Sequence, residues 1–423
     1  KNYANGHVVE LLESDVQLGR WNLDAKSFNQ VNSPENRATA VQINAFLDES
    51  RGTEVKLYFA KIFGLDHVNL SASSTALFGS RDIVLVLDYS GSMSDDSELK
   101  HVSPLGQNEV ESYLTDIWNQ LRALPGSPLQ ALAGTRMAER EVEIRAEYDY
   151  QILSELGLQY RDENNHLVDV PYPYPSEEYH LGGNWEDYFD YVQDKQREAY
   201  QYKYGYLTLM DYLQARQYIF SEHQVPLYLT NQQPITAVKN AVTIFLEYMN
   251  QQPTDDRISL ASYTYSDGRA NLEQSLTDDF SAIENASRNL HAGYYHNYTN
   301  IAAGIETAIN ELLTRGRFSA LRFIVLLSDG HANFDADNWP YYDPIGARAN
   351  ALAQAYVAAE HKFPIVTISL GADVDWQLMQ DIADITEGVH FIVPGGDSVS
   401  EYEDDLYEIF RQVAQHRSLK LVN

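Results

Sequence analysis

Two short runs of apolar residues, 83–87 and 323–327, lack helical periodicity and are typical of strands buried on both faces of a parallel sheet. Between and after them, apolar residues recur at helical spacing in several segments, including those that follow Pro234 and Thr299. Further strands are predicted at 257–264, 270–276, 364–370 and 390–393, and further helices at 278–290, 345–361, 376–386 and 399–415. Because right-handed crossovers place such helices on both faces of a sheet, the pattern predicts an α/β fold with a doubly wound, mainly parallel sheet. Segment 270–276 is the predicted antiparallel edge strand.

Residues 1–80 have a different pattern, in which short alternating segments and turn residues replace long helices. Strands are predicted at 7–12, 16–21, 37–44, 54–58 and 68–72. A short apolar helical turn is predicted at Phe59, Ile62 and Phe63, and Gly64 closes it. We therefore expect a separate β-rich N-terminal module.

The α/β domain is predicted to comprise residues 81–93 and 234–417, and residues 94–233 are predicted to be an insert within it. Helices are predicted in the insert at 108–124, 129–156 and 186–222, with an extended link at 170–175. The insert holds 16 of the chain's 30 tyrosines. These tyrosines either pack against one another with their hydroxyls in water, or form a recognition surface. Because the insert follows the first strand, we expect it to flank or roof the sheet's C-terminal edge.

Oxygen-bearing side chains follow both central strands. Asp88, Ser90 and Ser92 alternate along the chain directly after the first strand, and Gly91 permits a tight turn there. Asp329 follows the second strand, and Thr299 lies in the loop ahead of an amphipathic helix. Carboxylate and hydroxyl oxygens are suitable ligands for a hard divalent cation. The pattern therefore predicts a cation site at the C-terminal edge of the sheet.

At these residues the chain resembles the von Willebrand factor A domain. The metal-ion-dependent adhesion site of that family uses Asp-x-Ser-x-Ser, a loop threonine and a later aspartate. By this resemblance the ligands of Mg²⁺, or of Mn²⁺ or Ca²⁺, would be Asp88, Ser90, Ser92, Thr299 and Asp329. The resemblance also implies the α/β fold that the hydrophobic pattern predicts.

Three hydroxyls and two carboxylates would leave a six-coordinate ion partly neutralised, with one position open to a carboxylate of another protein. The open position could also polarise a substrate in a hydrolase, but no general base stands beside it. His331 is the nearest histidine in the sequence, and a single loop histidine is usually solvated. We therefore expect no enzymatic activity. A second group of acids, Asp335, Asp337 and Asp343, lacks the glycine and glutamate of an EF-hand and is interpreted as a solvated or contact loop.

Composition narrows the possible partners. The 423 residues include 61 acidic and 30 basic side chains, for a net charge of −31, which argues against nucleic acid and anionic membrane surfaces as partners. The chain has no cysteine, so disulfides and thiolate zinc sites are excluded. No apolar run reaches the roughly 18 residues of a membrane span. The start at Lys1, without an initiator methionine, suggests a processed product.

The N-terminal region carries a second resemblance. The segments ESDVQLGRWN and VKLYFAKIFGLDHVNLSASSTAL, which run into RDIVLVLD, are similar to the region ahead of the von Willebrand A domain in bacterial Tad-type pilus assembly proteins of the TadE/TadG sort. In that family a transmembrane helix precedes a β-rich module. This chain lacks the helix, and removal of an upstream segment would explain the difference.

The sequence therefore predicts a bacterial protein of the cell surface or exterior, associated with a pilus, that binds a carboxylate of a protein partner through a divalent cation. The high negative charge requires that partner to offer a projecting acidic residue or a basic rim around it. The alternative is a structural subunit that polymerises with other copies or pilus subunits through exposed strands of the module, with the metal serving only to stiffen the domain.

Overall fold

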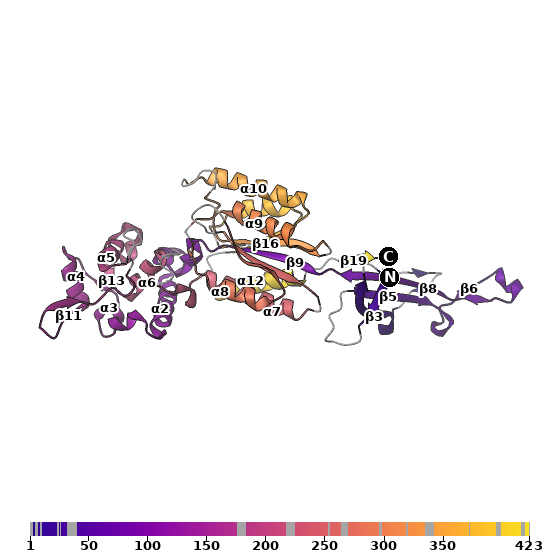
Figure 1. Cartoon of the computed structure of the whole chain (residues 1–423), viewed down its shortest axis with the longest axis horizontal. Helices are drawn as coiled ribbons and strands as arrows, with labels where there is room; N and C mark the ends of the chain where they lie inside the picture. The colour runs from indigo at the N-terminus through magenta and orange to yellow at the C-terminus, as the bar shows by residue number, and fades with distance from the viewer. Residues whose placement is uncertain are drawn as a thin grey trace.

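Two adjacent parallel strands, β9 (Arg81–Leu87) and β16 (Leu321–Ser328), form the centre of a six-stranded sheet in the computed structural model. The structure describes residues 3–4, 7–8, 11–22, 25, 27–31, 40–175, 183–216, 225–252, 254–263, 270–295, 298–318, 320–334, 342–371, 373–394, 399–415 and 419–422. Figure 1 shows an elongated molecule with the α/β domain in the middle, the helical insert at one end and the β-rich module at the other.

The sheet has the strand order β15-β14-β9-β16-β17-β18. Its other strands are β14 (Arg257–Ser262), β15 (Asn271–Thr277), β17 (Ile365–Leu370) and β18 (His390–Val393). All neighbours pair in parallel except β15, which lies at the edge antiparallel to β14. The predicted doubly wound, mainly parallel sheet with one antiparallel edge strand is therefore confirmed. The strand order reverses beside β9, and ligands of open α/β sheets bind at such a point.

Helices cover both faces of the sheet (Figure 1). One face carries α7 (Ile235–Asn250), α8 (Phe280–Arg288) and α12 (Val399–Gln415), and the other carries α9 (Ile301–Thr314), α10 (Pro344–Glu360) and α11 (Trp376–Ile385). All seven residues of β9 are buried, because alternate side chains enter the two cores. Gly304 lets α9 approach β9 closely, since an added Cβ would lie 2.7 Å from Val86 Cγ1. This close packing fixes the start of α9 at the C-terminal edge of the sheet.

The helices of the insert are shorter and more often interrupted than the sequence pattern predicted. Its helices are α1 (Val102–Leu105), α2 (Gln107–Ala123), α3 (Arg136–Glu139), α4 (Asp149–Leu156), α5 (Trp185–Gln193) and α6 (Tyr206–Ala215). Its strands are β10 (Val142–Glu143), β11 (Gln159–Arg161), β12 (Leu167–Asp169) and β13 (Lys203–Tyr204).

The predicted helices 129–156 and 186–222 are wrong as continuous elements. β10 interrupts the first and β13 interrupts the second, and these two strands pair with each other. Arg140 is fully extended, and Gly205 approaches Glu141 so closely that an added Cβ would overlap its carboxylate. The last part of the second prediction, 217–222, lies outside the described residues.

The aromatic residues of the insert form much of its own core. Tyr188, Tyr204 and Tyr212 are fully or almost fully buried, and their rings meet edge to face at centroid distances of 5.6 to 6.2 Å. The interpretation that the tyrosines pack against one another holds for this group. Their hydroxyls are not in water, however: the Tyr188 hydroxyl lies 2.8 Å from that of Thr208. The alternative interpretation, a recognition surface, would depend on exposed tyrosines such as Tyr148 and Tyr150.

Stability of the insert is expected to fall as pH rises through neutrality, because of Glu141. Its carboxylate accepts hydrogen bonds from Leu207 N and Thr208 Oγ1, both at 2.9 Å, and burial raises its pKa to about 7. The stability that the protonated acid contributes is complete below pH 4.5 and is lost as pH rises through the folded pKa. Between pH 5 and pH 8 we expect a loss of about 2 kcal/mol that Glu141→Gln abolishes.

Hydrogen exchange of α6 in a urea series at both pH values would measure this loss. Glu143→Gln is the matched control, because the Glu143 carboxylate is exposed and pairs with Arg145. Equal pH dependence in wild type and Glu141→Gln would contradict the prediction.

The β-rich module is a five-stranded antiparallel sheet with the order β19-β8-β5-β3-β4. Its strands are β3 (Val16–Asn22), β4 (Ser27–Gln30), β5 (Ala40–Leu47), β8 (Leu70–Phe78) and β19 (Leu419–Val422). Two further hairpins pair β1 (Tyr3–Ala4) with β2 (His7–Val8), and β6 (Val55–Lys56) with β7 (His67–Val68). The sequence pattern did not predict β19, through which the end of the chain returns to cover β8. The start of the predicted strand 37–44 lies outside the described residues.

No helix within the described ranges combines the length and the apolar character needed to cross a bilayer.

Candidate metal centre

The first loop of the candidate site begins where β9 ends. Asp88 is completely buried, and its Oδ1 accepts a hydrogen bond of 2.8 Å from the backbone N–H of Ser90. This bond turns the chain so that the short helix η4 (Gly91–Ser97) can start at once. The hydroxyls of Ser90 and Ser92 then lie 2.9 Å apart. The Asp-x-Ser-x-Ser segment therefore gathers its three side chains at the C-terminal end of the strand.

The second loop joins the first through Asp329, which follows β16. The Ser92 hydroxyl donates to Asp329 Oδ1 at 2.8 Å, so Ser92 lies between Ser90 and Asp329. Gly330 lies beside the first loop, since an added Cβ would meet Ser92 Oγ at an ordinary contact distance of 3.7 Å. The structure thus brings together four of the five side chains proposed from sequence: Asp88, Ser90, Ser92 and Asp329.

Thr299 lies at the same edge of the sheet, where its contacts are with Asn333. Its backbone N–H donates to Asn333 Oδ1 at 3.0 Å, and its carbonyl accepts from the N–H of Asn333 at 3.1 Å. Asn333 belongs to the loop that follows Asp329. Among the hydrogen bonds of the described residues, those of Thr299 run to Asn333 instead of to the other four side chains. Thr299 is therefore placed beside the site by backbone contacts, and its side chain is 3% exposed.

Two residues that sequence reasoning missed support Asp88. The hydroxyl of Ser328 donates to Asp88 Oδ2 at 3.0 Å. The hydroxyl of Tyr263 lies 3.0 Å from the same oxygen and 2.6 Å from the carbonyl of Leu327. Both residues lie at the C-terminal ends of strands next to β9. This position in the strand order is the feature of the sequence from which their contact with Asp88 could have been predicted.

The surroundings of Asp88 and Asp329 disfavour the negative charge of both carboxylates. Burial raises the pKa of Asp88. Burial also raises the pKa of Asp329 well above its usual range, and the negative charges of Asp88 and Asp95 raise it further. A hard cation suits such a set, because it prefers oxygen ligands and would neutralise the adjacent carboxylates. Among the described residues, no group of three or more His, Cys, Asp or Glu side chains forms a metal site, so the fit depends on hydroxyls as well as carboxylates.

A cavity of about 340 Å³ opens beside Ser92 and Asp329. The near end of the insert contributes Asp95, Asp96 and His101 to its lining, and α12 contributes Tyr402. Asp96 accepts a hydrogen bond of 3.2 Å from the Tyr402 hydroxyl and lies 3.2 Å from His101 Nδ1. The insert therefore flanks the site and is attached to α12 there, while its larger part extends away from the sheet (Figure 1).

These acids are already paired within the insert. Asp95 contacts Lys100, and His101 Nε2 lies 3.6 Å from Asp95 Oδ2. Although burial opposes it, Asp96 and Asp95 raise the pKa of His101. The acidic rim is thus partly neutralised by its own neighbours, unlike Asp88 and Asp329.

Other acids and the histidine considered from sequence lie elsewhere. Asp343 caps α10 and accepts a hydrogen bond of 3.0 Å from Gly346 N–H, whereas Asp335 and Asp337 are outside the described residues. His331 is exposed.

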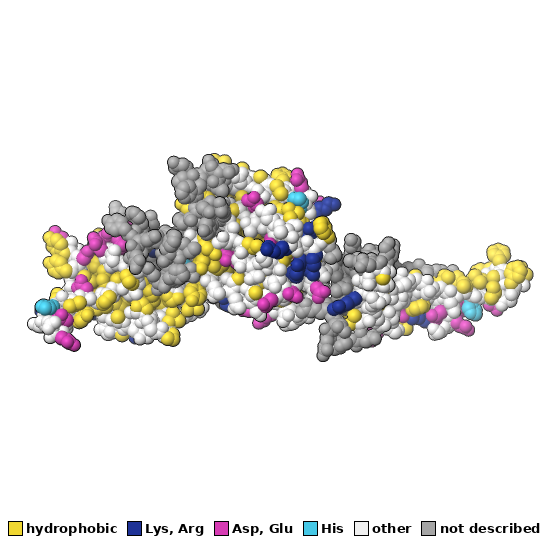
Figure 2. All heavy atoms as spheres, viewed as in Figure 1, with side chains coloured by type: hydrophobic (Ala, Val, Ile, Leu, Met, Phe, Trp, Pro, Cys, Tyr) yellow, Lys and Arg dark blue, Asp and Glu magenta, His cyan; other side chains and the backbone are white. Residues whose placement is uncertain are grey.

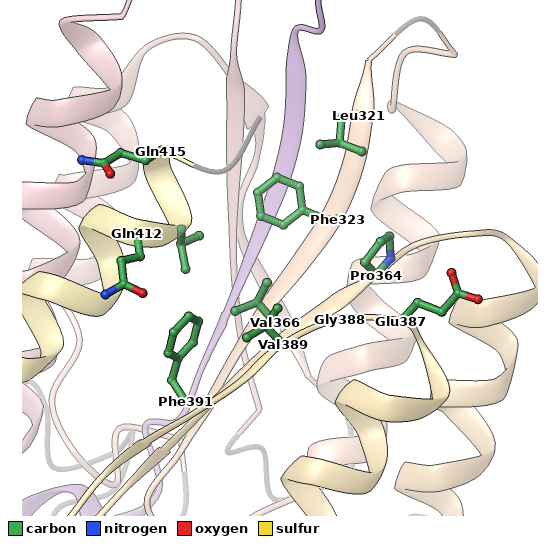
Figure 3. Close-up of a pocket in the computed structure, with 11 residues that line it drawn as sticks. Leu321, Phe323, Pro364, Val366, Glu387, Gly388, Val389, Phe391, Gln412 and Gln415 are labelled. Atoms are coloured by element: carbon green, nitrogen blue, oxygen red, sulfur yellow. The ribbon is translucent and has the colours of Figure 1, made fainter. Parts of the chain in front are cut away.

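A second cavity, of about 420 Å³, lies between the sheet and α12 (Figure 3). Its lining is mainly apolar, and it opens near the start of β16, where Leu321 and Phe323 lie, at the opposite end of the strand from Asp329. It has no part in the candidate metal centre.

Two protein families match parts of the chain. The von Willebrand factor type A domain matches residues 229–405, and the Tad-like Flp pilus-assembly family matches residues 1–76. The first match begins at the end of the insert, so Asp88, Ser90 and Ser92 lie ahead of it. The comparison with curated proteins gave no match.

Solved structures with similar parts include three from different organisms. A von Willebrand factor type A protein from Catenulispora acidiphila is 18% identical, with 45% of this chain and 39% of that chain covered and a TM-score of 0.32. The pilus adhesin SpaC from Lactobacillus rhamnosus GG is 12% identical, with 93% and 37% covered and a TM-score of 0.36. The manganese-loaded TRAP protein from Plasmodium vivax is 13% identical, with 44% and 68% covered and a TM-score of 0.31. These superpositions are too loose to carry a functional argument.

The chain thus contains a segment that matches the von Willebrand factor type A domain, and its first 76 residues match the Tad-like pilus-assembly family. The two matches point to a bacterial module associated with adhesion or with a pilus.

Proposed function

We propose that this protein is a pilus-associated binding protein of the bacterial surface, and that its α/β domain uses a divalent cation to bind a carboxylate of a protein partner. The observation that carries the proposal is the chain of contacts that joins Asp88, Ser90, Ser92 and Asp329 at one point. These residues come from two loops 237 positions apart, measured from Ser92 to Asp329. With Thr299 beside them, they form the proposed ligand set.

The surrounding residues prepare this ligand set. Tyr263 and Ser328 fix the inner oxygen of Asp88, and Ser92 lines the cavity with buried Ser90 in contact behind it. A cation bound there would offer a coordination position to a partner carboxylate. The oxygens of Ser92 and Asp329 reach the cavity wall, so a ligand that enters the cavity would meet the cation directly.

Charge restricts the partner. The chain carries a net charge of −31, and Asp95 and Asp96 form part of the cavity wall. A flat acidic surface would be repelled, whereas a single projecting carboxylate with basic neighbours would match both the cation and this rim. We propose binding without catalysis, because His331 is exposed and His101 in the cavity wall is already engaged by Asp95 and Asp96.

The structural-subunit alternative depended on exposed strands of the module. The two edges of its five-stranded sheet are β19 and β4, and each of these strands has only four residues. Very short edge strands disfavour strand addition between copies. Filaments that form with rising protein concentration and persist in a chelator would favour that alternative.

The metal alone is the first probe. We expect calorimetric titration of Mg²⁺, Mn²⁺ or Ca²⁺ into the chelator-treated full chain to give saturable binding with one ion per chain. Addition of EDTA should reverse it. Absence of saturable heat with all three ions, or binding that changes the melting temperature by tens of degrees, would contradict a ligand-binding role.

A further inference from the structure

The β6–β7 hairpin ends in a projecting apolar loop, residues 58–65, which we name the apolar tip. Its large side chains are almost fully exposed: Tyr58 by 86%, Phe59 by 87%, Ile62 by 84% and Phe63 by 83%. Figure 2 shows this loop as a hydrophobic patch at the extreme end of the molecule, beyond the acidic side chains of the module. Single exposed apolar residues are ordinary on protein surfaces, but a contiguous group of this size marks an interaction site.

The tip is closed by its own backbone hydrogen bonds. The short helix η3 (Ala60–Phe63) ends at Gly64, whose left-handed φ of 76° lets its N–H bond to the carbonyl of Lys61 at 3.0 Å. Leu65 N–H bonds to the carbonyl of Ala60 at 3.2 Å, and Leu57 N–H bonds to that of Asp66 at 3.0 Å. A loop that satisfies these groups internally can leave water at a low cost.

Charge sets the tip apart from the rest of the chain. Residues 57–65 contain no acid and one base, Lys61, in a protein with a net charge of −31. The Lys61 side chain is 61% exposed, and its ammonium is 3.9 Å from Asp66, at the limit of an ion pair. A lysine that extends from an apolar loop can reach lipid phosphates while its stem stays among acyl chains.

Each of the four large apolar side chains is more than 80% exposed, so the rest of the chain covers little of any of them. A protein partner covers one face of a loop, and the opposite face would stay in water. A bilayer surrounds an inserted loop, and aromatic residues such as Tyr58 and Phe59 favour its interface with water. We propose that the apolar tip inserts into the boundary between headgroups and acyl chains of a lipid bilayer, and so docks the module end of the molecule on a membrane.

The acidic chain would be repelled by an anionic membrane, but the position of the tip keeps most of that negative charge away from the bilayer. Screening at physiological salt limits repulsion to about 8 Å, and the tip projects from the end of an elongated molecule (Figure 1). We therefore expect binding to zwitterionic vesicles. Anionic lipid should weaken binding at low salt and weaken it less at high salt.

Flotation with phosphatidylcholine vesicles tests the proposal on the full chain. We expect wild type to float and the double variant Phe59→Ser, Phe63→Ser to lose about tenfold or more of its partition coefficient. Phe318→Ser is the matched control, because Phe318 is 96% exposed on the α/β domain and should not affect flotation. Because the substituted side chains are exposed, the melting temperature should be unchanged in both variants.

A second readout locates the contact. In Phe59→Trp, the added fluorescence should shift to the blue with vesicles and be quenched by brominated acyl chains. Failure of wild type to float, or flotation that the double variant retains, would overturn the proposal. Self-association that depends on Phe59 and Phe63, without vesicle binding, would overturn it in favour of a contact between copies. None of these outcomes bears on metal binding, which titration measures separately.

Discussion

Replacement of Asp82 with alanine is expected to reduce the free energy of unfolding of the α/β domain by about 3 kcal/mol. Asp82 is completely buried at the start of β9 and accepts hydrogen bonds from two arginines. Arg257 donates through Nη2 at 2.8 Å, and Arg317 donates through both its backbone N and its Nη2 at 2.6 Å. The carboxylate thus holds together β9, β14 and the loop that leads to β16. Loss of one partner from a buried pair costs about 3–5 kcal/mol, and the lower end applies because both arginines are partly exposed.

The pH dependence of this contribution has a definite sign. Burial alone would raise the pKa of Asp82, but the hydrogen bonds from Arg257 and Arg317 lower it below its usual value. Stability from a carboxyl with a lowered folded pKa is present above the unfolded pKa, near 4, and is lost as pH falls through the folded value. The difference between wild type and Asp82→Ala should therefore be full at pH 7 and shrink below pH 4.

Hydrogen exchange of β9 and β16 amides in a urea series would measure the effect separately from the insert and the module. Asp255→Ala is the matched control, because Asp255 is exposed and lies in the loop before β14. Its effect should stay within about 0.5 kcal/mol. If both variants unfolded at the same urea concentration, Asp82 would not have the role that its contacts indicate.

Replacement of Asp88 with alanine is expected to weaken divalent-cation binding by at least about 100-fold. The variant removes the carboxylate that accepts the Ser90 N–H, and with it the turn that aligns Ser90 with Ser92. The fold should survive, because the remaining hydroxyls keep other acceptors. Tyr263 retains the carbonyl of Leu327 at 2.6 Å, and Ser328 retains that of Gly330 at 3.4 Å.

Calorimetric titration with Mn²⁺, together with a thermal melt, would measure both parts of this prediction. Asp343→Asn is a suitable control, since Asp343 lies at the same edge of the sheet but caps α10. It should bind Mn²⁺ as wild type does. Retained affinity in Asp88→Ala would remove Asp88 from the ligand set, and loss of affinity in Asp343→Asn would move the site toward the acidic loop.

The sequence predicts the central sheet well because its central strands are buried on both faces and are therefore rich in apolar residues. β9 is buried along its whole length, and its residues 83–87 form a continuous apolar run that is typical of a strand buried on both faces. Asp88 follows such a run directly and Asp329 follows another after Ser328, and parallel strands end at the same edge. Their meeting could therefore be expected from the order of strands alone.

The insert and the end of the chain were harder to predict for physical reasons. Residues 129–156 keep a helical spacing of apolar side chains, but the pairing of β10 with β13 depends on residues about 60 positions apart. β19 has four residues, Leu419–Val422, and its pairing with β8 is likewise a long-range contact. Tyr263 and Ser328 have no motif of their own, and only the strand order brings them to Asp88.

The most direct test of the proposed metal centre is a crystal of the full chain grown with Mn²⁺ and measured for anomalous scattering. The proposed ligand set predicts one peak bounded by Asp88, Ser90, Ser92 and Asp329, with the serine hydroxyls about 2–2.5 Å from the ion. A peak beside Asp95 and Asp96 instead, or no peak at this edge of the sheet, would contradict it.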